Sequence, residues 1–358
     1  MSSIQFVIAG ISGDVSKRKV LPAIKEFVVL NPDTKINLYG LSRSVVDTNE
    51  MQSIVGEYDN LFINLIQYDY RDSELISNIL SSAEYTIVYL ALPPVAFVNL
   101  LNLFCFLDKS KFDIVIEKPF ASNFDEYQNI LNIVQNCRLE KNVHFFDHYM
   151  FKPGLDFDKY YSEFDDLFDN HVNKISKIHI RALEKIGIEG RGNYYDKIGA
   201  IKDMIFHLFS MLLKLYRKIG NVLEVNDLDV RNIVKAQYNG YRDEVDNHNS
   251  LTETYFLIDS FDKKNGIHII FESGKKQPEK ETSIEIFFNN GDIIKIFIAP
   301  DMFIKVFSNG QEKKIYASQD LPVYQEHVIM FHSLINKDKS NFWKKEDIYN
   351  VWQFVENI

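Results

Sequence analysis

The sequence predicts a two-part fold of the α/β + α+β class, with a parallel sheet first and a large antiparallel sheet after it. Over the first ~145 residues, short apolar runs alternate with helical patterns, which is typical of parallel strands covered by helices on both faces. After His148, strand-like runs follow one another with turn signals between them, which favours antiparallel pairing. We therefore expect one domain at residues 1–147 and a second at residues 148–358.

In the first domain, the apolar runs have the length of buried strands, and the segments between them have helical spacing. The predicted strands are Ile4–Ala9, Lys35–Tyr39, Tyr85–Ala91, Phe112–Ile116 and Val143–Phe146. The predicted helices are Lys17–Leu30, Val95–Leu107 and Phe124–Gln135. Because helices connect successive strands, the strands should lie parallel in one sheet.

In the second domain, the pattern changes to strands joined by turns. Asn290-Gly291 stands between the strand-like runs Ile284–Phe288 and Ile293–Ile298, which is a strong hairpin signal. The other expected elements are a strand at Ile175–Leu183, a helix at Tyr194–Leu215, further strands within Glu253–Ser308, and two closing helices at Val323–Ile335 and Lys345–Val355.

Composition and charge exclude several classes of protein. The chain has 358 residues, with 40 Lys and Arg against 50 Asp and Glu, and this net charge of −10 argues against a nucleic-acid partner. The only cysteines, Cys105 and Cys137, rule out a disulfide framework and a Cys-rich zinc or iron–sulfur site. The N-terminus lacks the pattern of a signal peptide, and the apolar stretches are too short or interrupted to span a bilayer. We expect a cytoplasmic protein with no membrane partner and no metal.

The turn after the first strand has the features of a phosphate-binding loop. Gly10, Ser12, Gly13 and Asp14 lie between that strand and the first helix. Glycines there allow a phosphate to approach the backbone, and the helix N-terminus attracts its charge, as in Rossmann dinucleotide-binding domains. The pattern is shorter than G-x-G-x-x-G, so a simple tight turn is the alternative interpretation.

Three further strand ends carry candidate binding residues. Ser42 and Arg43 follow the second strand, where a hydroxyl and a guanidinium suit the 2′-phosphate of NADP better than the ribose of NAD; a solvated loop arginine is the alternative. Ala91 ends the next buried strand, and Pro93 and Lys118 follow buried strands, at the edge where open α/β sheets bind ligands. As isolated features, these residues are also consistent with strand termination.

Acid–histidine pairs suggest proton transfer. Asp147 and His148 end the last parallel strand, and Asp203 and His207 lie one turn apart on a predicted helix. A histidine held by a carboxylate is a common general base. A histidine that only packs in the core is the alternative for His207.

A long motif, EGRGNYYDKIGAIKD at Glu189–Asp203, ends at the acid of the second acid–histidine pair. With this motif as the most specific match, the sequence resembles the glucose-6-phosphate dehydrogenase family over nearly the whole chain, in order. The other matching segments are Gly10–Ile24, EKPF at 117–120, DHY at 147–149 with Lys152, Ala236–Tyr241, Thr252–Thr254, Ser273–Lys275 with Lys280, Asn289–Pro300 and Pro322–Ile358.

The resemblance implies roles for individual residues. It implies NADP as cofactor, with NAD as a weaker alternative, a sugar-phosphate substrate, and a homodimer formed through the sheet domain. His207 would be the base, Asp147 its orienting acid, and Lys118 would touch cofactor and substrate. The cofactor residues would be Gly10, Ser12, Gly13, Asp14, Ser42, Arg43, Ala91, Pro93 and Lys118, and the substrate residues His148, Tyr149, Lys152, Glu184, Asp203, Lys275 and Lys280.

The chain also departs from the family pattern. Asp203 and His207 are four residues apart where the family usually has five, and Phe145 and Glu272 stand where arginines are usual. A four-residue spacing is associated with the related Gfo/Idh/MocA oxidoreductases. The leading hypothesis is oxidation of glucose 6-phosphate at C1 with NADP. The alternatives are an oxidoreductase of the same fold that acts on another phosphorylated or nucleotide-linked sugar, and an inactive NADP-binding regulator.

Overall fold

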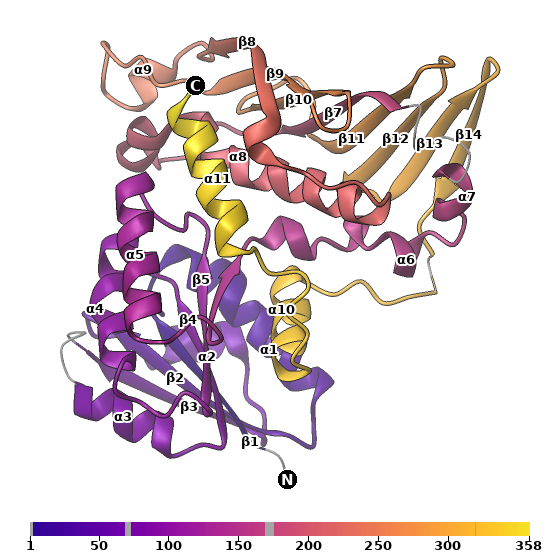
Figure 1. The fold of residues 1–358 in the computed structure, drawn as a ribbon. Helices are drawn as coiled ribbons and strands as arrows, with labels where there is room; N and C mark the ends of the chain where they lie inside the picture. The colour runs from indigo at the N-terminus through magenta and orange to yellow at the C-terminus, as the bar shows by residue number, and fades with distance from the viewer. Residues whose placement is uncertain (1–2, 69–72, 169–174, 319) are drawn as a thin grey trace. The chain divides into compact units, whose positions relative to one another are not determined.

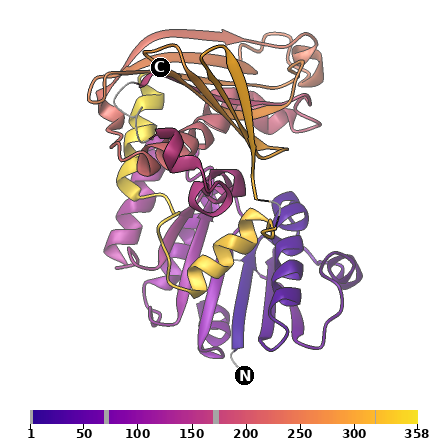
Figure 2. The same ribbon diagram turned by 90° about the vertical axis from the view of Figure 1, so that its right-hand side faces the viewer.

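The computed structural model describes residues 3–68, 73–168, 175–318 and 320–358 (Figure 1, Figure 2). The chain divides into two compact units. Unit 1 comprises Met1–His148 and Tyr324–Tyr349, and unit 2 comprises Tyr149–Val323 and Asn350–Ile358. Unit 1 therefore includes a C-terminal segment that the sequence analysis assigns to the second domain.

Unit 1 is built on a six-stranded parallel sheet with the strand order β3-β2-β1-β4-β5-β6. Phe6, Val7, Ile8 and Ala9 are consecutive in β1 and at most 2% exposed, so this strand is covered on both faces. The strands are β1 (Ser3–Ala9), β2 (Lys35–Ser42), β3 (Leu61–Gln67), β4 (Tyr85–Leu90), β5 (Phe112–Glu117) and β6 (Val143–Phe146).

Helices connect these strands, as the alternating pattern predicts. Asn123 fixes the start of α5, because its side chain accepts a hydrogen bond from the Glu126 amide. The Glu126 carboxylate in turn accepts a hydrogen bond from the Ser122 amide. The helices are η1 (Ser16–Val20), α1 (Leu21–Leu30), α2 (Thr48–Val55), α3 (Ser73–Ser81), α4 (Pro94–Phe104), α5 (Phe124–Asn136) and α10 (Glu326–Ile335); α11 (Lys345–Glu356) begins in unit 1 and continues into unit 2.

Unit 2 is built on an eight-stranded sheet with the strand order β14-β13-β12-β11-β7-β10-β9-β8. The predicted antiparallel pairing is wrong at one place: β7 and β10 run parallel, and the other neighbouring strands run antiparallel. The strands are β7 (Ile175–Leu183), β8 (Leu228–Ala236), β9 (Tyr255–Asp262), β10 (Ile267–Gly274), β11 (Glu281–Phe288), β12 (Ile293–Ala299), β13 (Phe303–Ser308) and β14 (Gln311–Tyr316).

The long helix α8 (Gly192–Lys218) packs against one face of this sheet (Figure 2). Leu208, Met211, Leu212 and Leu215 are fully buried on it, which gives the expected apolar side of the helix. The short helices are η2 (His148–Phe151), η3 (Pro153–Leu155), α6 (Phe157–Tyr160), α7 (Phe164–Phe168), η5 (Val225–Asp227) and α9 (Tyr241–Glu244).

The predicted hairpin at Asn290-Gly291 is confirmed. It joins β11 to β12, and Gly291 has φ +91°, a conformation that glycine adopts without steric cost. The sequence patterns did not predict α2, α3, β3, β8 or β14, nor the short helices η2, η3, α6, α7, η5 and α9.

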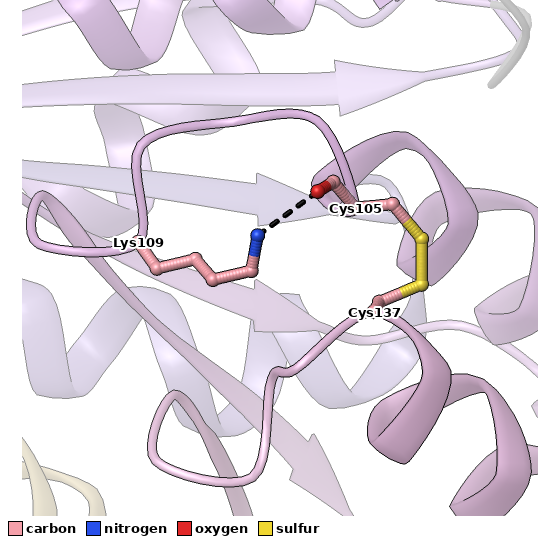
Figure 3. The surroundings of a disulfide bond; sticks show 3 residues. All are labelled: Cys105, Lys109 and Cys137. Atoms are coloured by element: carbon pink, nitrogen blue, oxygen red, sulfur yellow. Dashed lines mark hydrogen bonds between the residues drawn. A yellow bond between two sulfur atoms is a disulfide. The ribbon is translucent and has the colours of Figure 1, made fainter.

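The two cysteines form one disulfide in unit 1 (Figure 3). Cys105 at the end of α4 is bonded to Cys137 at the end of α5, and the Lys109 ammonium donates a hydrogen bond to the Cys105 carbonyl. Two cysteines cannot form a framework of several disulfides, and nothing in the sequence pattern predicts this single bond. Among the described residues, no helix is long and apolar enough to cross a membrane.

Candidate active site

The loop after β1 is a tight backbone cradle. Gly10 has φ +87°, and a Cβ at this position would lie 2.2 Å from the Ala91 carbonyl oxygen. The Gly10 carbonyl accepts hydrogen bonds from the Gly13 amide at 3.0 Å and from the Ser16 hydroxyl at 2.9 Å. The chain then enters the helical segment that continues into α1. Because side chains are excluded and a helix N-terminus follows, these residues fit the pyrophosphate of a dinucleotide.

The end of β2 contacts this loop directly. The Ser12 and Ser42 hydroxyls are hydrogen-bonded at 3.0 Å, and Ser42 is only 2% exposed, so it fixes the loop. Arg43, the next residue, is exposed. Asp14 forms an exposed ion pair with Arg18 on the following turn, so its carboxylate faces the helix surface.

At the neighbouring strand ends, Ala91 packs against the glycine loop and Pro93 precedes the first residue of α4. Lys118 directly follows β5, where its amide donates a hydrogen bond to the Phe146 carbonyl at 3.1 Å. The predicted cofactor residues of β1, β2, β4 and β5 therefore all lie at the carboxyl edge of the parallel sheet.

A buried polar network beside Lys118 is absent from the sequence prediction. The Tyr89 hydroxyl donates a hydrogen bond to Glu117 at 2.7 Å and lies 3.2 Å from His327 Nε2. Burial and, to a smaller extent, the charge of Asp147 raise the pKa of Glu117 to about 7, although Tyr89 and Lys118 act in the opposite direction. Burial lowers the pKa of His327 to about 4. Glu117 belongs to the EKPF segment, which is the one sequence signal that points to it.

Asp147 and His148 end unit 1. Asp147 directly follows β6 and is fully buried, whereas the His148 side chain is 29% exposed. The His148 Nδ1 atom lies 3.8 Å from an Asp147 carboxylate oxygen, which is within ion-pair range but long for a hydrogen bond.

In unit 2, α8 is interrupted just before its predicted functional residues. Gly199 has φ +68° and ψ 175°, so the helix restarts at Ala200. Glu253 caps the restarted helix: its carbonyl accepts a hydrogen bond from the Ala200 amide at 2.9 Å, and its carboxylate accepts one from the Ile201 amide at 3.0 Å. Asp203 and His207 lie on this second segment, one turn apart.

His207 is held by an aromatic stack. Its ring and that of Tyr149 have centroids 4.2 Å apart and planes inclined by 18°. The Lys152 ammonium lies 4.8 Å from the centre of the Tyr149 ring, so the structure brings three predicted residues together. His207 is 5% exposed and Tyr149 is 8% exposed.

A second cluster in unit 2 centres on a buried lysine. The Lys275 ammonium, whose side chain is 5% exposed, is hydrogen-bonded to Glu184 and lies 3.5 Å from Asp203. Glu184 and Lys275 directly follow β7 and β10, and the parallel register of these strands places them side by side. Lys280 is an exposed residue just before β11, and no hydrogen bond or ion pair in the described part of the chain joins it to this cluster.

This arrangement suits the recognition of a polyol. Carboxylates accept hydrogen bonds from hydroxyl groups, and an ammonium donates to them. Tyr195 adds a buried hydroxyl without a hydrogen-bond partner, with the Lys275 ammonium 5.8 Å from its ring centre. Sequence reasoning missed Tyr195, although it lies within the specific segment Glu189–Asp203.

Comparison with known families gives two matches in chain order. Residues 69–155 match "Glucose-6-phosphate dehydrogenase, NAD binding domain", and residues 162–217 match "Glucose-6-phosphate dehydrogenase, C-terminal domain". The two matched segments hold Lys118, Asp147, Asp203 and His207.

Individual relatives match over most of their length. Glucose-6-phosphate 1-dehydrogenase from Helicobacter pylori (strain J99) is 23% identical, covering 100% of this chain and 93% of the relative. Glucose-6-phosphate 1-dehydrogenase 5, cytoplasmic, from Arabidopsis thaliana is also 23% identical, covering 98% and 84%. A solved structure, a glucose-6-phosphate dehydrogenase in complex with its substrate, has a TM-score of 0.78 at 19% identity, covering 98% of this chain and 90% of that chain. At that identity, the structural likeness shows a shared fold.

Proposed function

We propose that this chain is a member of the glucose-6-phosphate dehydrogenase family and that it oxidises glucose 6-phosphate at C1 to the 6-phosphogluconolactone, with NADP as the hydride acceptor. The observation that carries the substrate assignment is the buried Lys275 between Glu184 and Asp203. The Lys275 ammonium donates hydrogen bonds to sugar hydroxyls, and the two carboxylates accept them; Asp203 lies one helical turn before His207. A dehydrogenase needs both these contacts and a base.

The cofactor assignment rests on unit 1, which we propose as the dinucleotide-binding domain. When bound, the nicotinamide accepts the hydride from C1. Arg43 and Ser42 favour the 2′-phosphate of NADP over the bare ribose of NAD. The cofactor residues in this proposal are Gly10, Ser12, Gly13, Asp14, Ser42, Arg43, Ala91, Pro93 and Lys118.

We assign His207 as the base that accepts the proton of the C1 hydroxyl. An alcohol releases hydride readily only as its proton leaves, so a base must stand ready at the C1 hydroxyl. Stacking on Tyr149 fixes the plane of the imidazole. Asp147 is assigned as the acid that orients and charges this base, and Lys118 as a contact to cofactor and substrate.

The substrate assignment concerns unit 2 and the end of β6. His148, Tyr149 and Lys152 would hold the phosphate, because an acidic protein must gather positive charge locally to bind it. The carboxylates of Glu184 and Asp203, with Lys275 and Lys280, would bind the sugar hydroxyls.

We also propose a homodimer formed through the sheet of unit 2. Helix α8 covers one face of this sheet, and the opposite face carries half-buried charged side chains. Arg181 lies there within 3.0–3.5 Å of the three carboxylates of Glu272, Glu281 and Glu285. A cytoplasmic location is proposed from the relative that is named so. Light scattering of the Arg181→Ala variant tests the dimer.

A substrate panel tests the function. We expect NADP reduction with glucose 6-phosphate, seen at the absorbance band of the reduced nicotinamide, and the lactone as product. The variant His207→Asn should lower kcat by about 10²–10⁴-fold and leave NADP affinity nearly unchanged. His268→Asn, which changes a half-exposed histidine on β10, is the matched control.

The same panel separates the alternatives, which the comparisons do not favour. Reduction only with another phosphorylated or a nucleotide-linked sugar would support the second hypothesis. NADP binding without turnover of any sugar would support the inactive regulator. A His207→Asn variant with kcat within a few-fold of wild type would remove His207 from the mechanism.

A further inference from the structure

A cavity lies in unit 1, at the edge of the parallel sheet opposite the cofactor loop. It has a volume of about 770 Å³. Its walls include Tyr85 and Phe112, the first residues of β4 and β5, and Asn142, which directly precedes β6. Asp113 in this wall is five residues before Lys118, so at about 3.3 Å per residue the two edges are roughly 16 Å apart.

Positive charge is concentrated in this cavity. Six cationic residues line it, against two carboxylates, Asp113 and Glu140, in a chain whose net charge is −10. The six cations are Lys109, Arg138, Lys141, Lys337, Lys339 and Lys345. Like charges gathered in one cavity repel one another, and an anion removes that repulsion.

The floor of the cavity is a buried hydrogen-bonded network. The Asp113 carboxylate accepts a hydrogen bond from Tyr85, lies 2.6 Å from His144 Nε2, and has Lys339 and Lys337 at 3.4 and 3.6 Å. Burial alone would raise the pKa of Asp113, but these partners hold it at about 2, so the carboxylate is ionised.

Two lysines therefore share one carboxylate. Burial lowers the pKa of Lys339, and the charge of Lys337 lowers it further, against the opposite effect of Asp113. The pKa of His144 is also lowered, by burial and by the charges of both lysines.

The walls on either side are fixed to each other. The Asn142 amide donates hydrogen bonds to the Lys109 and Phe112 carbonyls at 2.7 and 2.6 Å. The Cys105–Cys137 disulfide joins the segment of Lys109 to that of Arg138 (Figure 3). The Lys109 ammonium donates a hydrogen bond to the Cys105 carbonyl, and Cys137 directly precedes Arg138. A site with fixed walls loses little conformational entropy on binding.

We propose that this cavity binds a small polyanion of linked phosphate groups, separately from the cofactor. Its volume suits a small molecule, and the acidic charge of the whole chain opposes a polymeric anion. An adjoining cavity of about 420 Å³ shares Lys141, Lys339 and Lys345 and is walled by Phe342 and Trp343. The ligand is therefore either an inorganic polyphosphate or a nucleoside polyphosphate whose base reaches the aromatic wall.

Isothermal titration calorimetry tests this with inorganic triphosphate and with ATP, each added to protein saturated with NADP and without sugar. Because no turnover is measured, the outcome is independent of the proposed dehydrogenase activity. We expect one binding site, whose affinity for the probe falls as the salt concentration rises from ~50 to ~200 mM. Equal affinity for both probes identifies the polyphosphate as the ligand, and tighter binding of ATP identifies a nucleotide.

Charge-removing variants locate the site. Lys141→Gln/Lys337→Gln should weaken triphosphate binding at least about tenfold, since each lost cation removes a charge-assisted contact. Lys25→Gln/Lys35→Gln, which changes two exposed lysines of unit 1 outside the cavity, should bind within about twofold of wild type. Absence of binding to the NADP-saturated protein, or equal affinity of the two double variants for triphosphate, would overturn the proposal.

Discussion

The pH dependence of stability should carry the signature of one carboxyl group, that of Glu117. Its side chain is 17% exposed, accepts a hydrogen bond from Tyr89, and has a pKa raised to about 7 by burial. A raised pKa means that the folded protein holds this proton more tightly than the unfolded chain does. Stability is therefore greatest below pH ~4.5 as far as this group is concerned, and it falls as the pH rises toward 7.

The size of the effect follows from the same two values. The ordinary pKa of 4.5 and the raised value of about 7 differ by an amount worth ~3 kcal/mol, at ~1.4 kcal/mol for each pKa unit. Glu117→Gln replaces the carboxyl with a neutral group of the same shape that still accepts from Tyr89. The variant should match wild type near pH 4.5, apart from a constant offset, and gain ~2–3 kcal/mol relative to it by pH 8.

Urea unfolding from pH 4.5 to 8, followed by tryptophan fluorescence, measures this difference. Trp343 lies in unit 1 and reports on it. Glu84→Gln removes the same charge from an exposed residue of unit 1, and its difference from wild type should stay flat. Parallel curves for wild type and Glu117→Gln across the whole range would refute the reasoning, because they would mean that Glu117 ionises alike in the folded and unfolded states.

Three further substitutions have distinct expected outcomes. Arg43→Ala should weaken NADP binding about 10–150-fold and change NAD binding little, as measured by fluorescence titration; equal losses would place Arg43 elsewhere. Lys152→Ala should raise KM for glucose 6-phosphate far more than for glucose, and similar effects on both sugars would contradict a phosphate contact. Gly199→Ala should cost at least ~1 kcal/mol more stability than Gly220→Ala in urea unfolding. Both glycines have positive φ, but only at Gly199 would a Cβ meet Glu253, at 2.5 Å, and equal costs would show that the contact is relieved.

Local sequence patterns are enough to predict the order of the main strands and helices of unit 1. The apolar runs at β1, β4, β5 and β6 and the helical spacing between them are enough to predict a parallel sheet, because each run must be buried on both faces. The edge strand β3 was missed, although Leu61–Ile66 is an apolar run after a turn. Its side chains are half-buried or exposed at every position, so its pattern is weaker than that of a central strand.

The candidate cofactor loop could also be predicted locally. Gly10 and Gly13 are required where a strand, a turn and a helix meet, and all three are recognisable from neighbouring residues in the sequence. The buried network around Glu117 could not be predicted from the sequence. One of its members, His327, is 210 positions further along the chain and reaches the network through Tyr89. No pattern near Glu117 indicates that a tyrosine and a distant histidine will bury it.

Periodicity by itself indicated most strands of unit 2, although not its edge strands β8 and β14, and only the tertiary structure decided how the strands pair. An alternating strand has the same pattern whether its neighbour runs parallel or antiparallel, since pleating sets the period and pairing does not. The parallel pairing of β7 with β10 brings their carboxyl ends together, so Glu184 and Lys275 leave the sheet side by side although they are 91 residues apart in the sequence. The residue types that suit a sugar were therefore present in the sequence, whereas their meeting around one buried ammonium depended on strand direction.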